Sequence, residues 1–365
     1  ATRKQSKQKG RNQQGGRATG YECEASQETQ GGKVCQPPAV LGSLWLHPAP
    51  CALMETMFDP PPDLAARLGE DLARKRLLRE QRVWKYKRGG SFRVIWGARV
   101  IPWIIRTGLR VAGLSRRTHR EFLDVQIVEN VVALPSLPVE FDGFRLLQIS
   151  DLHSDLDPAL IDRVIERLGE ARFDQAVLTG DYHDEIGVPW DESLALTLRL
   201  VPHLGAEPLA ILGNHDFLAK VAPFEAGGLR VLLNESIALE RNGMRIWICG
   251  VDDPHIYGTH DLRAAMAGIP GDGCRILLSH SPETALEASG LGYALHLSGH
   301  THGGQICLPG GFPIVRKAPV RRALLAGPWR EGAMAGYTSR GTGSCTVAAR
   351  FHCPPEITVH ILRCA

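Results

Sequence analysis

Short runs of aspartate, histidine and asparagine recur in this chain directly after apolar segments. The runs read QISDLHSD, LTGDYHDE, ILGNHDF, LLSHSPE and LSGHTHGGQ. Carboxylate, imidazole and amide groups bind divalent cations such as Mn²⁺, Fe²⁺, Zn²⁺ and Mg²⁺. No run contains a cysteine, which argues against a structural zinc site of the cysteine type. The sequence therefore predicts a metal centre that takes part in catalysis.

The candidate ligands occupy seven positions in these runs, and we expect them to meet at one site. They are Asp151, His153, Asp181, Asn214, His280, His300 and His302. Glycines accompany them, and we expect these to let the backbone approach the site closely or to adopt positive φ. These glycines are Gly180, Gly213, Gly299, Gly303 and Gly304. His183, by contrast, is expected to be an ordinary histidine without a role in the site.

Apolar runs alternate with helical patterns after residue 122, which indicates a layered α/β domain. Strands are expected at 144–149, 175–178, 208–212, 246–250, 275–278 and 293–297. Helices are expected at 158–169, 193–201, 262–267 and 282–288. Sites in such folds form at the carboxyl ends of the strands, so side chains distant in sequence converge there.

The order DxH, GDxxD, GNHD, a single His and GHTHGGQ resembles the calcineurin-like metallophosphoesterases across roughly residues 144–361. The stretches HTHGGQICLP, SRGTG and CPPEITVHIL resemble the bacterial branch. That branch includes membrane-associated phosphodiesterases and UDP-2,3-diacylglucosamine hydrolases. The protein phosphatases of the superfamily continue GDxxD with Arg-Gly, whereas Glu185 and Ile186 follow here, which disfavours a phosphoprotein substrate.

The resemblance implies a four-layer αββα sandwich and two divalent ions, with Mn²⁺ the first choice and Fe, Zn or Mg as alternatives. It assigns one ion to Asp151, His153, Asp181 and His302. It assigns the other to Asp181, Asn214, His280 and His300, so that Asp181 bridges. Activated hydroxide then attacks phosphorus in line.

Three further residues are predicted to act around the two ions. His215 would stabilise or protonate the leaving oxygen, because its ordinary pKa near 6.5 suits proton transfer. Asp184 would orient His215. Arg340 in SRGTG would bind substrate, although a surface role for this arginine is an equal alternative.

The basic charge of the chain is concentrated in one segment. Residues 71–120 hold 15 of the 42 Lys and Arg but only 2 of the 39 Asp and Glu. Within it, residues 91–117 form a basic amphipathic pattern, predicted to bend at Pro102, with arginines on one side and apolar residues on the other. We expect this segment to lie on an anionic membrane surface, and an amphipathic helix packed on the catalytic domain is the alternative. No nucleic-acid motif accompanies the charge, so no nucleic-acid partner is expected.

Three regions are predicted from composition along the 365 residues. Residues 1–62 are expected to be disordered, with part of them not native, because they contain few large apolar side chains. Residues 63–120 are expected to form a basic helical extension, and residues 121–365 the catalytic domain. The nine cysteines are widely spaced without a CxxC pair, and we expect reduced thiols in a cytoplasmic protein.

The predicted function is hydrolysis of phosphodiester or pyrophosphate bonds, with a lipid-linked substrate such as UDP-2,3-diacylglucosamine at the inner face of the cytoplasmic membrane. Three alternatives stay open: a phosphodiesterase for soluble nucleotides, a nuclease, and a non-catalytic metal-binding scaffold. The acidic catalytic region, with 30 acidic and 19 basic residues after position 120, would repel a polyanionic substrate and disfavours the nuclease.

Overall fold

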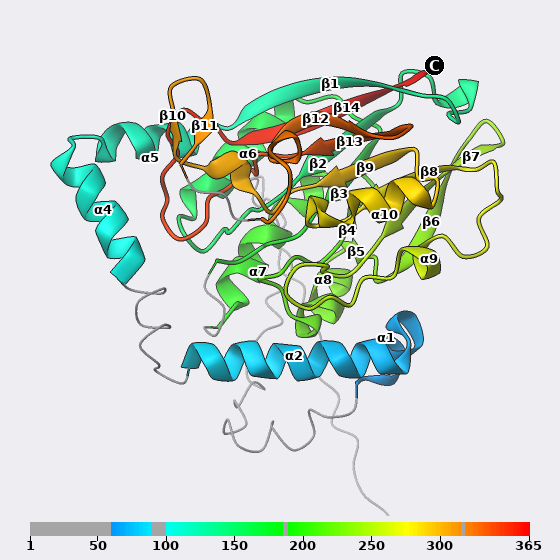
Figure 1. Cartoon of the computed structure of the whole chain (residues 1–365), viewed down its shortest axis with the longest axis horizontal. Helices are drawn as coiled ribbons and strands as arrows, with labels where there is room; N and C mark the ends of the chain where they lie inside the picture. The colour runs from blue at the N-terminus through cyan, green and yellow to red at the C-terminus, as the bar shows by residue number, and fades with distance from the viewer. Residues whose placement is uncertain (1–59, 89–99, 185–188, 315–317) are drawn as a thin grey trace, which may run out of the picture. The chain divides into compact units, whose positions relative to one another are not determined.

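Two six-stranded sheets form the centre of the computed structural model, which describes residues 60–88, 100–184, 189–314 and 318–365 (Figure 1). The first sheet has the order β1-β14-β2-β3-β4-β5. Its strands are β1 (Gln126–Leu134), β14 (Glu356–Cys364), β2 (Arg145–Ile149), β3 (Gln175–Leu178), β4 (Leu209–Ala210) and β5 (Arg230–Val231). From β2 to β5 the neighbouring strands are parallel, whereas β14 runs antiparallel to β2.

The second sheet has the order β12-β13-β9-β8-β7-β6. Its strands are β12 (Gly327–Glu331), β13 (Met334–Thr338), β9 (Leu295–Ser298), β8 (Cys274–Leu278), β7 (Met244–Gly250) and β6 (Glu235–Arg241). The four inner strands are parallel and the two edge strands are antiparallel. A separate two-stranded hairpin joins β10 (Cys307–Leu308) to β11 (Phe312–Pro313).

The two sheets pack face to face, and helices cover their outer faces. In β3, Val177 points into the apolar cluster between the sheets, while Ala176 and Leu178 point towards the helices, as the period of two in a strand requires. The first sheet is covered by α6 (Ala159–Glu170), α7 (Asp191–Leu198) and α8 (Val221–Ala226). The second is covered by α9 (Leu262–Ala265) and α10 (Ala285–Gly290). The predicted αββα sandwich is confirmed.

Each of the six predicted strands is present, with ends that differ by no more than two residues. The sequence pattern did not identify the remaining described strands: β1, β5, β6, β10, β11, β12, β13 and β14. In β6, no residue is fully buried, and three of its seven residues are charged, so this edge strand lacks a clear apolar pattern. The helical extension predicted from residue 63 onwards begins as two helices, α1 (Pro62–Leu68) and α2 (Glu70–Arg88), separated by Gly69 with a φ of 81°.

Helix α2 packs against the catalytic region through a buried arginine. Arg76 is fully buried and donates a hydrogen bond to the carbonyl of Asp216 at 2.9 Å. It also pairs with Asp252 and Glu80, each at 3.3 Å, and stacks on the ring of Tyr257. Burial of a charge is costly unless it is paired, so these contacts fix the helix next to the loop that follows β4. The proposed boundary at residue 120 stays a prediction.

The predicted amphipathic segment lies partly outside the described residues. Residues 1–59, which make up nearly all of the segment predicted to be disordered, lie wholly outside them. Its described part forms α4 (Ile101–Val111) and α5 (Ser115–Leu123), separated by Gly113 with a φ of 70°. Pro102 lies in the first turn of α4, where its missing N–H is not needed, so the break in the described part falls at Gly113 instead. None of the described helices is both long and apolar enough to span a bilayer.

Candidate metal centre

The predicted ligands follow the carboxyl ends of parallel strands in both sheets. Strand β2 leads to Asp151 and His153, β3 to Asp181, β4 to Asn214, β8 to His280, and β9 to His300 and His302. All seven side chains are buried. Residues up to 151 positions apart, Asp151 and His302, therefore meet where the ends of the two sheets converge, as the sequence predicted.

Five of these residues have a left-handed backbone, which is uncommon for residues other than glycine. They are Asp151 (φ 53°), His153 (φ 40°), Asp181 (φ 60°), His300 (φ 68°) and His302 (φ 51°). Each such residue costs about 1–3 kcal/mol and persists only where the surroundings enforce it. Strain of this kind concentrates at functional sites, and here it turns the side chains away from the strand direction and towards one another.

Two of the predicted glycines make this arrangement possible by their lack of a side chain. A Cβ atom at Gly299 would lie 1.9 Å from Oγ of Ser150 and 2.2 Å from a carboxylate oxygen of Asp151. At Gly213 it would lie 2.2 Å from a carboxylate oxygen of Asp181. The expected close approach of the backbone at these two positions is confirmed.

The first group of donors consists of Asp151, His153 and Asp181, whose ligand atoms lie within 4.8 Å of one another. His302 joins them, because its Nε2 lies 3.2 Å from Nε2 of His153 and 3.4 Å from Oδ1 of Asp151. His153 donates from Nδ1 to the carbonyl of His183 at 2.9 Å, which directs Nε2 into the group. His183 thus contributes through its backbone, a role that its side-chain type does not reveal.

The second group consists of Asp181, His280 and His300, again within 4.8 Å. Nε2 of His280 lies 3.1 Å from Oδ2 of Asp181 and 3.1 Å from Oδ1 of Asn214. Its Nδ1 donates to the carbonyl of Thr179 at 2.7 Å, which again leaves Nε2 directed inward. Asp181 is the residue common to both groups.

The donors fit divalent cations in their chemistry and their electrostatics. Nε2 of His300 is buried without a hydrogen-bond partner, a costly state that a ligated cation would relieve. Burial lowers the pKa of His300 well below its ordinary value, so the ring stays neutral, as a ligand must. Burial raises the pKa of Asp181, but His280, His215 and His153 together outweigh burial and hold this pKa well below its usual range. The carboxylate that both groups share is therefore ionised.

Asp216 fixes the loop that carries Asp181. Its Oδ2 accepts hydrogen bonds from the backbone N–H groups of Asp181 at 2.8 Å and Gly213 at 2.9 Å. Its Oδ1 pairs with the fully buried Lys220 at 2.8 Å. The sequence placed Asp216 in the GNHD block but gave no role to it or to Lys220.

His215 and Asp184 lie beside the first group, with their ligand atoms within 4.8 Å of His153. The backbone N–H of His215 donates to Oδ1 of Asp181 at 2.9 Å. Nδ1 of His215 donates to the backbone carbonyl of Asp184, so the expected orienting contact exists but uses the carbonyl, not the carboxylate. The Asp184 carboxylate instead accepts from the backbone N–H of Thr346 at 2.8 Å.

Arg340 lies next to the turn that carries His302, but its guanidinium is paired with the buried carboxylate of Glu356 at 2.5 Å. Part of its donor capacity is therefore used, and its predicted contact with substrate stays a prediction. A different arginine, Arg350, is fully buried and donates to the carbonyls of His302 at 3.1 Å and Gly343. The sequence signal for Arg350 was a single charge within the apolar run VAARF.

Two further residues near the donors were not predicted. The ring of His255 lies 4.2 Å from that of His300 and bonds Glu283 at 2.8 Å, which raises the pKa of His255. The sulfur of Cys345 lies within 4.8 Å of ligand nitrogens of His153 and His302. No motif marked either position, because both are brought in by loops remote from the five runs.

Comparison with known proteins gives consistent matches. The sequence profile of the calcineurin-like phosphoesterases matches residues 144–304. The uncharacterized metallophosphoesterase YkuE of Bacillus subtilis is 32% identical over 248 residues, covering 66% of this chain and 86% of that protein. Phosphodiesterase YaeI of Escherichia coli is 31% identical over 231 residues, covering 59% and 81%. A transmembrane protein with a metallophosphoesterase domain from Danio rerio is 30% identical over 320 residues, covering 81% and 68%.

Proposed function

Because the chain belongs to the calcineurin-like metallophosphoesterases, we propose that its two donor groups hold two divalent ions and that it hydrolyses phosphodiester or diphosphate bonds. It is a hydrolase of phosphoester bonds by its family. The observation that supports a two-ion centre is the presence of Asp181 in both groups. A carboxylate that donates to two ions holds them close enough to act on one phosphate.

The proposed ligands divide between the two ions as the two donor groups do. Asp151, His153, Asp181 and His302 would hold the first ion. The second would be held by Asp181, Asn214, His280 and His300. The donor set accepts several ions, and we take Mn²⁺ as the first to test, with Fe, Zn and Mg as alternatives.

The protein's own groups would position the substrate and move the proton. Bound divalent ions supply a nucleophile from water near neutral pH and offset phosphate charge. The hydrogen bond from Nδ1 of His215 to the Asp184 carbonyl leaves Nε2 free to face the leaving oxygen. Asp216 keeps Asp181 in place through two backbone hydrogen bonds. Arg350 holds the backbone of His302.

Hydrolysis of bis-p-nitrophenyl phosphate tests the reaction directly. We expect turnover of the full chain with added Mn²⁺ and its loss in excess chelator, with recovery when metal is restored. The matched control is Asp142→Asn, which alters a carboxylate on the loop before β2, remote from the five runs, and should leave turnover unchanged. Absence of turnover with Mn²⁺, Fe²⁺, Zn²⁺ and Mg²⁺ alike would contradict the enzyme and favour the scaffold.

We further propose that the enzyme works at an anionic membrane on a lipid-linked substrate such as UDP-2,3-diacylglucosamine, at the inner face of the cytoplasmic membrane. Helix α4 supports this, because Trp103 is 64% and Ile104 47% exposed while Arg106 and Arg110 are exposed on the same helix. An interfacial helix presents this combination to lipid head groups and acyl chains. An amphipathic helix packed on the catalytic domain would bury its apolar face instead.

The position of α5 gives the membrane proposal a connection to the metal centre. The carbonyl of Thr118 in α5 accepts a hydrogen bond from the backbone of Arg350 at 3.0 Å, and Arg350 in turn bonds His302. The name of the Danio rerio relative describes a transmembrane protein, which also favours action at a membrane. A soluble nucleotide phosphodiesterase stays the alternative.

Vesicle flotation and a substrate panel separate these two functions. Wild type should float with anionic vesicles, and the double change Trp103→Asp and Ile104→Asp should abolish flotation without altering hydrolysis of bis-p-nitrophenyl phosphate. Val139→Asp, at another exposed apolar position (74% exposed), is the matched control. Unchanged flotation of the double variant, or turnover of soluble nucleotides but not of UDP-2,3-diacylglucosamine, would contradict the lipid-linked proposal.

A further inference from the structure

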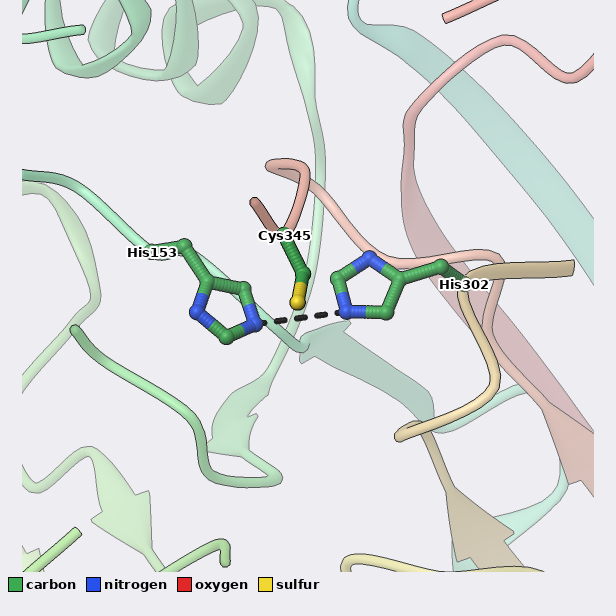
Figure 2. Close-up of side chains that lie close together, drawn as sticks. All are labelled: His153, His302 and Cys345. Atoms are coloured by element: carbon green, nitrogen blue, oxygen red, sulfur yellow. Dashed lines mark hydrogen bonds between the residues drawn. The ribbon is translucent and has the colours of Figure 1, made fainter. Parts of the chain in front are cut away.

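Cys345 is distinguished from the other described cysteines by its position beside two ligand histidines. Figure 2 shows its side chain directed towards the space between the rings of His153 and His302. Its sulfur and one nitrogen of each ring lie within 4.8 Å of one another, and the two nitrogens are 3.2 Å apart. His153 comes from the loop after β2, His302 from the loop after β9, and Cys345 from the loop between β13 and β14.

The other cysteines in the described part of the chain have different surroundings. Cys249 and Cys274 are buried in apolar clusters, where a cysteine acts as a small hydrophobic residue. Cys307 and Cys353 make sulfur contacts with backbone carbonyls of the 302–303 turn. Cys364 is exposed at the end of β14. Among them, the grouping with two imidazoles is particular to Cys345.

The loop of Cys345 is held in place by hydrogen bonds at both of its peptide groups. The side-chain amide of Gln305 donates to the carbonyl of Cys345 at 3.0 Å, and its oxygen accepts from the Cys345 N–H at 3.1 Å. The next residue, Thr346, has a φ of 73° and donates its N–H to the Asp184 carboxylate at 2.8 Å. The thiol is therefore positioned by residues that belong to the centre itself, since Gln305 ends the GHTHGGQ run.

We propose that Cys345 is a sulfur ligand of the ion held by His153 and His302, an inference that rests on the metal centre proposed above. Zinc binds nitrogen at about 2.0–2.1 Å and sulfur at about 2.3 Å with tetrahedral angles, which places two nitrogens about 3.4 Å apart and a sulfur about 3.6 Å from each nitrogen. The two nitrogens, 3.2 Å apart, match this separation, and the sulfur, within 4.8 Å of them, would move towards the ion by up to about 1 Å. Sulfur binds as thiolate, so its proton passes to solvent as the metal–sulfur bond forms.

A sulfur ligand changes the metal preference at one of the two positions. Thiolate with imidazole selects Zn²⁺, Fe²⁺ or Co²⁺ over Mn²⁺ and Mg²⁺, which prefer oxygen. The second group offers Asp181, Asn214, His280 and His300 and contains no sulfur. The two positions should therefore differ, with a thiophilic ion at the first and a wider choice at the second.

Titration of the full chain, freed of metal by chelator, with Co²⁺ tests this inference by absorbance. Visible d–d bands report cobalt in the nitrogen and oxygen ligands, and a near-ultraviolet charge-transfer band reports a cobalt–sulfur bond. Wild type should show both. Cys345→Ser should lose the charge-transfer band and keep the visible bands. It should also bind Zn²⁺ more weakly, by about 10–100-fold or more, because removal of a residue that only contacts a metal ligand already weakens binding by that factor. Cys364→Ser, the matched control, should behave as wild type.

Each failure has a separate meaning. Visible bands without a charge-transfer band in wild type would overturn the sulfur ligand and leave the metal centre intact. Absence of both bands would overturn the centre and the sulfur ligand together. If Cys345→Ser is not folded, X-ray absorption of zinc-loaded wild type decides, because a sulfur ligand gives a shell near 2.3 Å and its absence would refute the inference.

Discussion

Two histidines four residues apart, His296 within β9 and His300 just after it, are both buried but have different surroundings. His296 has extended backbone, packs edge-on against Trp329 and has one weak polar neighbour, Thr284, at 3.5 Å. His300 has a φ of 68° and lies among Asp181 and His280. Burial lowers the pKa of both, to about 3 for His296. Only His300 faces carboxylates from another sheet.

The difference between them comes from the end of the strand. Inside a strand, neighbouring residues on one sheet fix what a side chain contacts, and an isolated buried histidine stays neutral. Beyond the last paired residue, a left-handed backbone turns the side chain towards the ends of other strands. His360, inside β14, is a second strand-interior histidine. It bonds the side-chain amides of Asn130 and Gln148, and, as for His296, burial lowers its pKa to about 3.

The largest effect is expected at Asp181, because this residue belongs to both donor groups. Asp181→Asn removes the charge shared by both donor groups, so we expect at least about a 10³-fold loss of kcat, equivalent to about 4 kcal/mol, and loss of bound metal. Steady-state kinetics and metal analysis measure both. A variant that retained two ions and more than a tenth of wild-type kcat would show that Asp181 is not a shared ligand of the two ions.

Matched substitutions at His300 and His296 test whether position in the strand separates a metal ligand from a structural histidine. His300→Gln should lower metal content and reduce kcat by about 10²–10³-fold, because it removes a proposed ligand. His296→Gln should leave metal content and kcat within a few-fold and instead lower the free energy of unfolding by about 1–3 kcal/mol. Equal losses of metal in both variants would show that strand position does not separate ligands from structural histidines.

A third strand-end histidine, His215, is expected to act without holding metal. His215→Ala should preserve both ions and lower kcat by about 10²–10⁴-fold, the usual contribution of a positioned acid or base. Loss of metal in this variant would instead make it a ligand, and an unchanged kcat would leave it without a role.

The smallest effect concerns the strand-interior histidines and pH. The pKa of His360 is lower in the folded protein, about 3, than the ordinary 6.5. The unfolded chain therefore binds more protons between these values, so His360 contributes stability above about pH 6.5 that is lost as pH falls towards 3. When the pH falls from 8 to 5, the free energy of unfolding of wild type should decrease by about 2 kcal/mol more than that of His360→Gln.

Chemical denaturation at the two pH values measures this difference. His203→Gln, at an exposed position, is the matched control and should lose as much as wild type. If His360→Gln and wild type lost equal free energy, His360 would not titrate as a buried neutral group.

Short local patterns in the sequence were sufficient to find the candidate runs and a layered α/β domain, whereas the four-layer sandwich was implied by the family resemblance. Polar residues directly after apolar strands identified Asp151, His280 and the other candidates, and the order of the blocks indicated the fold. Local patterns could not place Arg350 or Cys345, since both lie in a loop whose position depends on Gln305 and α5. Nor could they show that Asp184 would contact His215 through its carbonyl, because backbone contacts are independent of side-chain type.

Anomalous diffraction from crystals of Zn²⁺-loaded protein tests the two-ion centre most directly, because zinc is compatible with both donor groups. We expect two anomalous peaks about 3.5–4 Å apart. Both should lie within coordination distance of Asp181, with one peak next to His153 and the other next to His280. A single peak, or two peaks of which only one contacts Asp181, would contradict it.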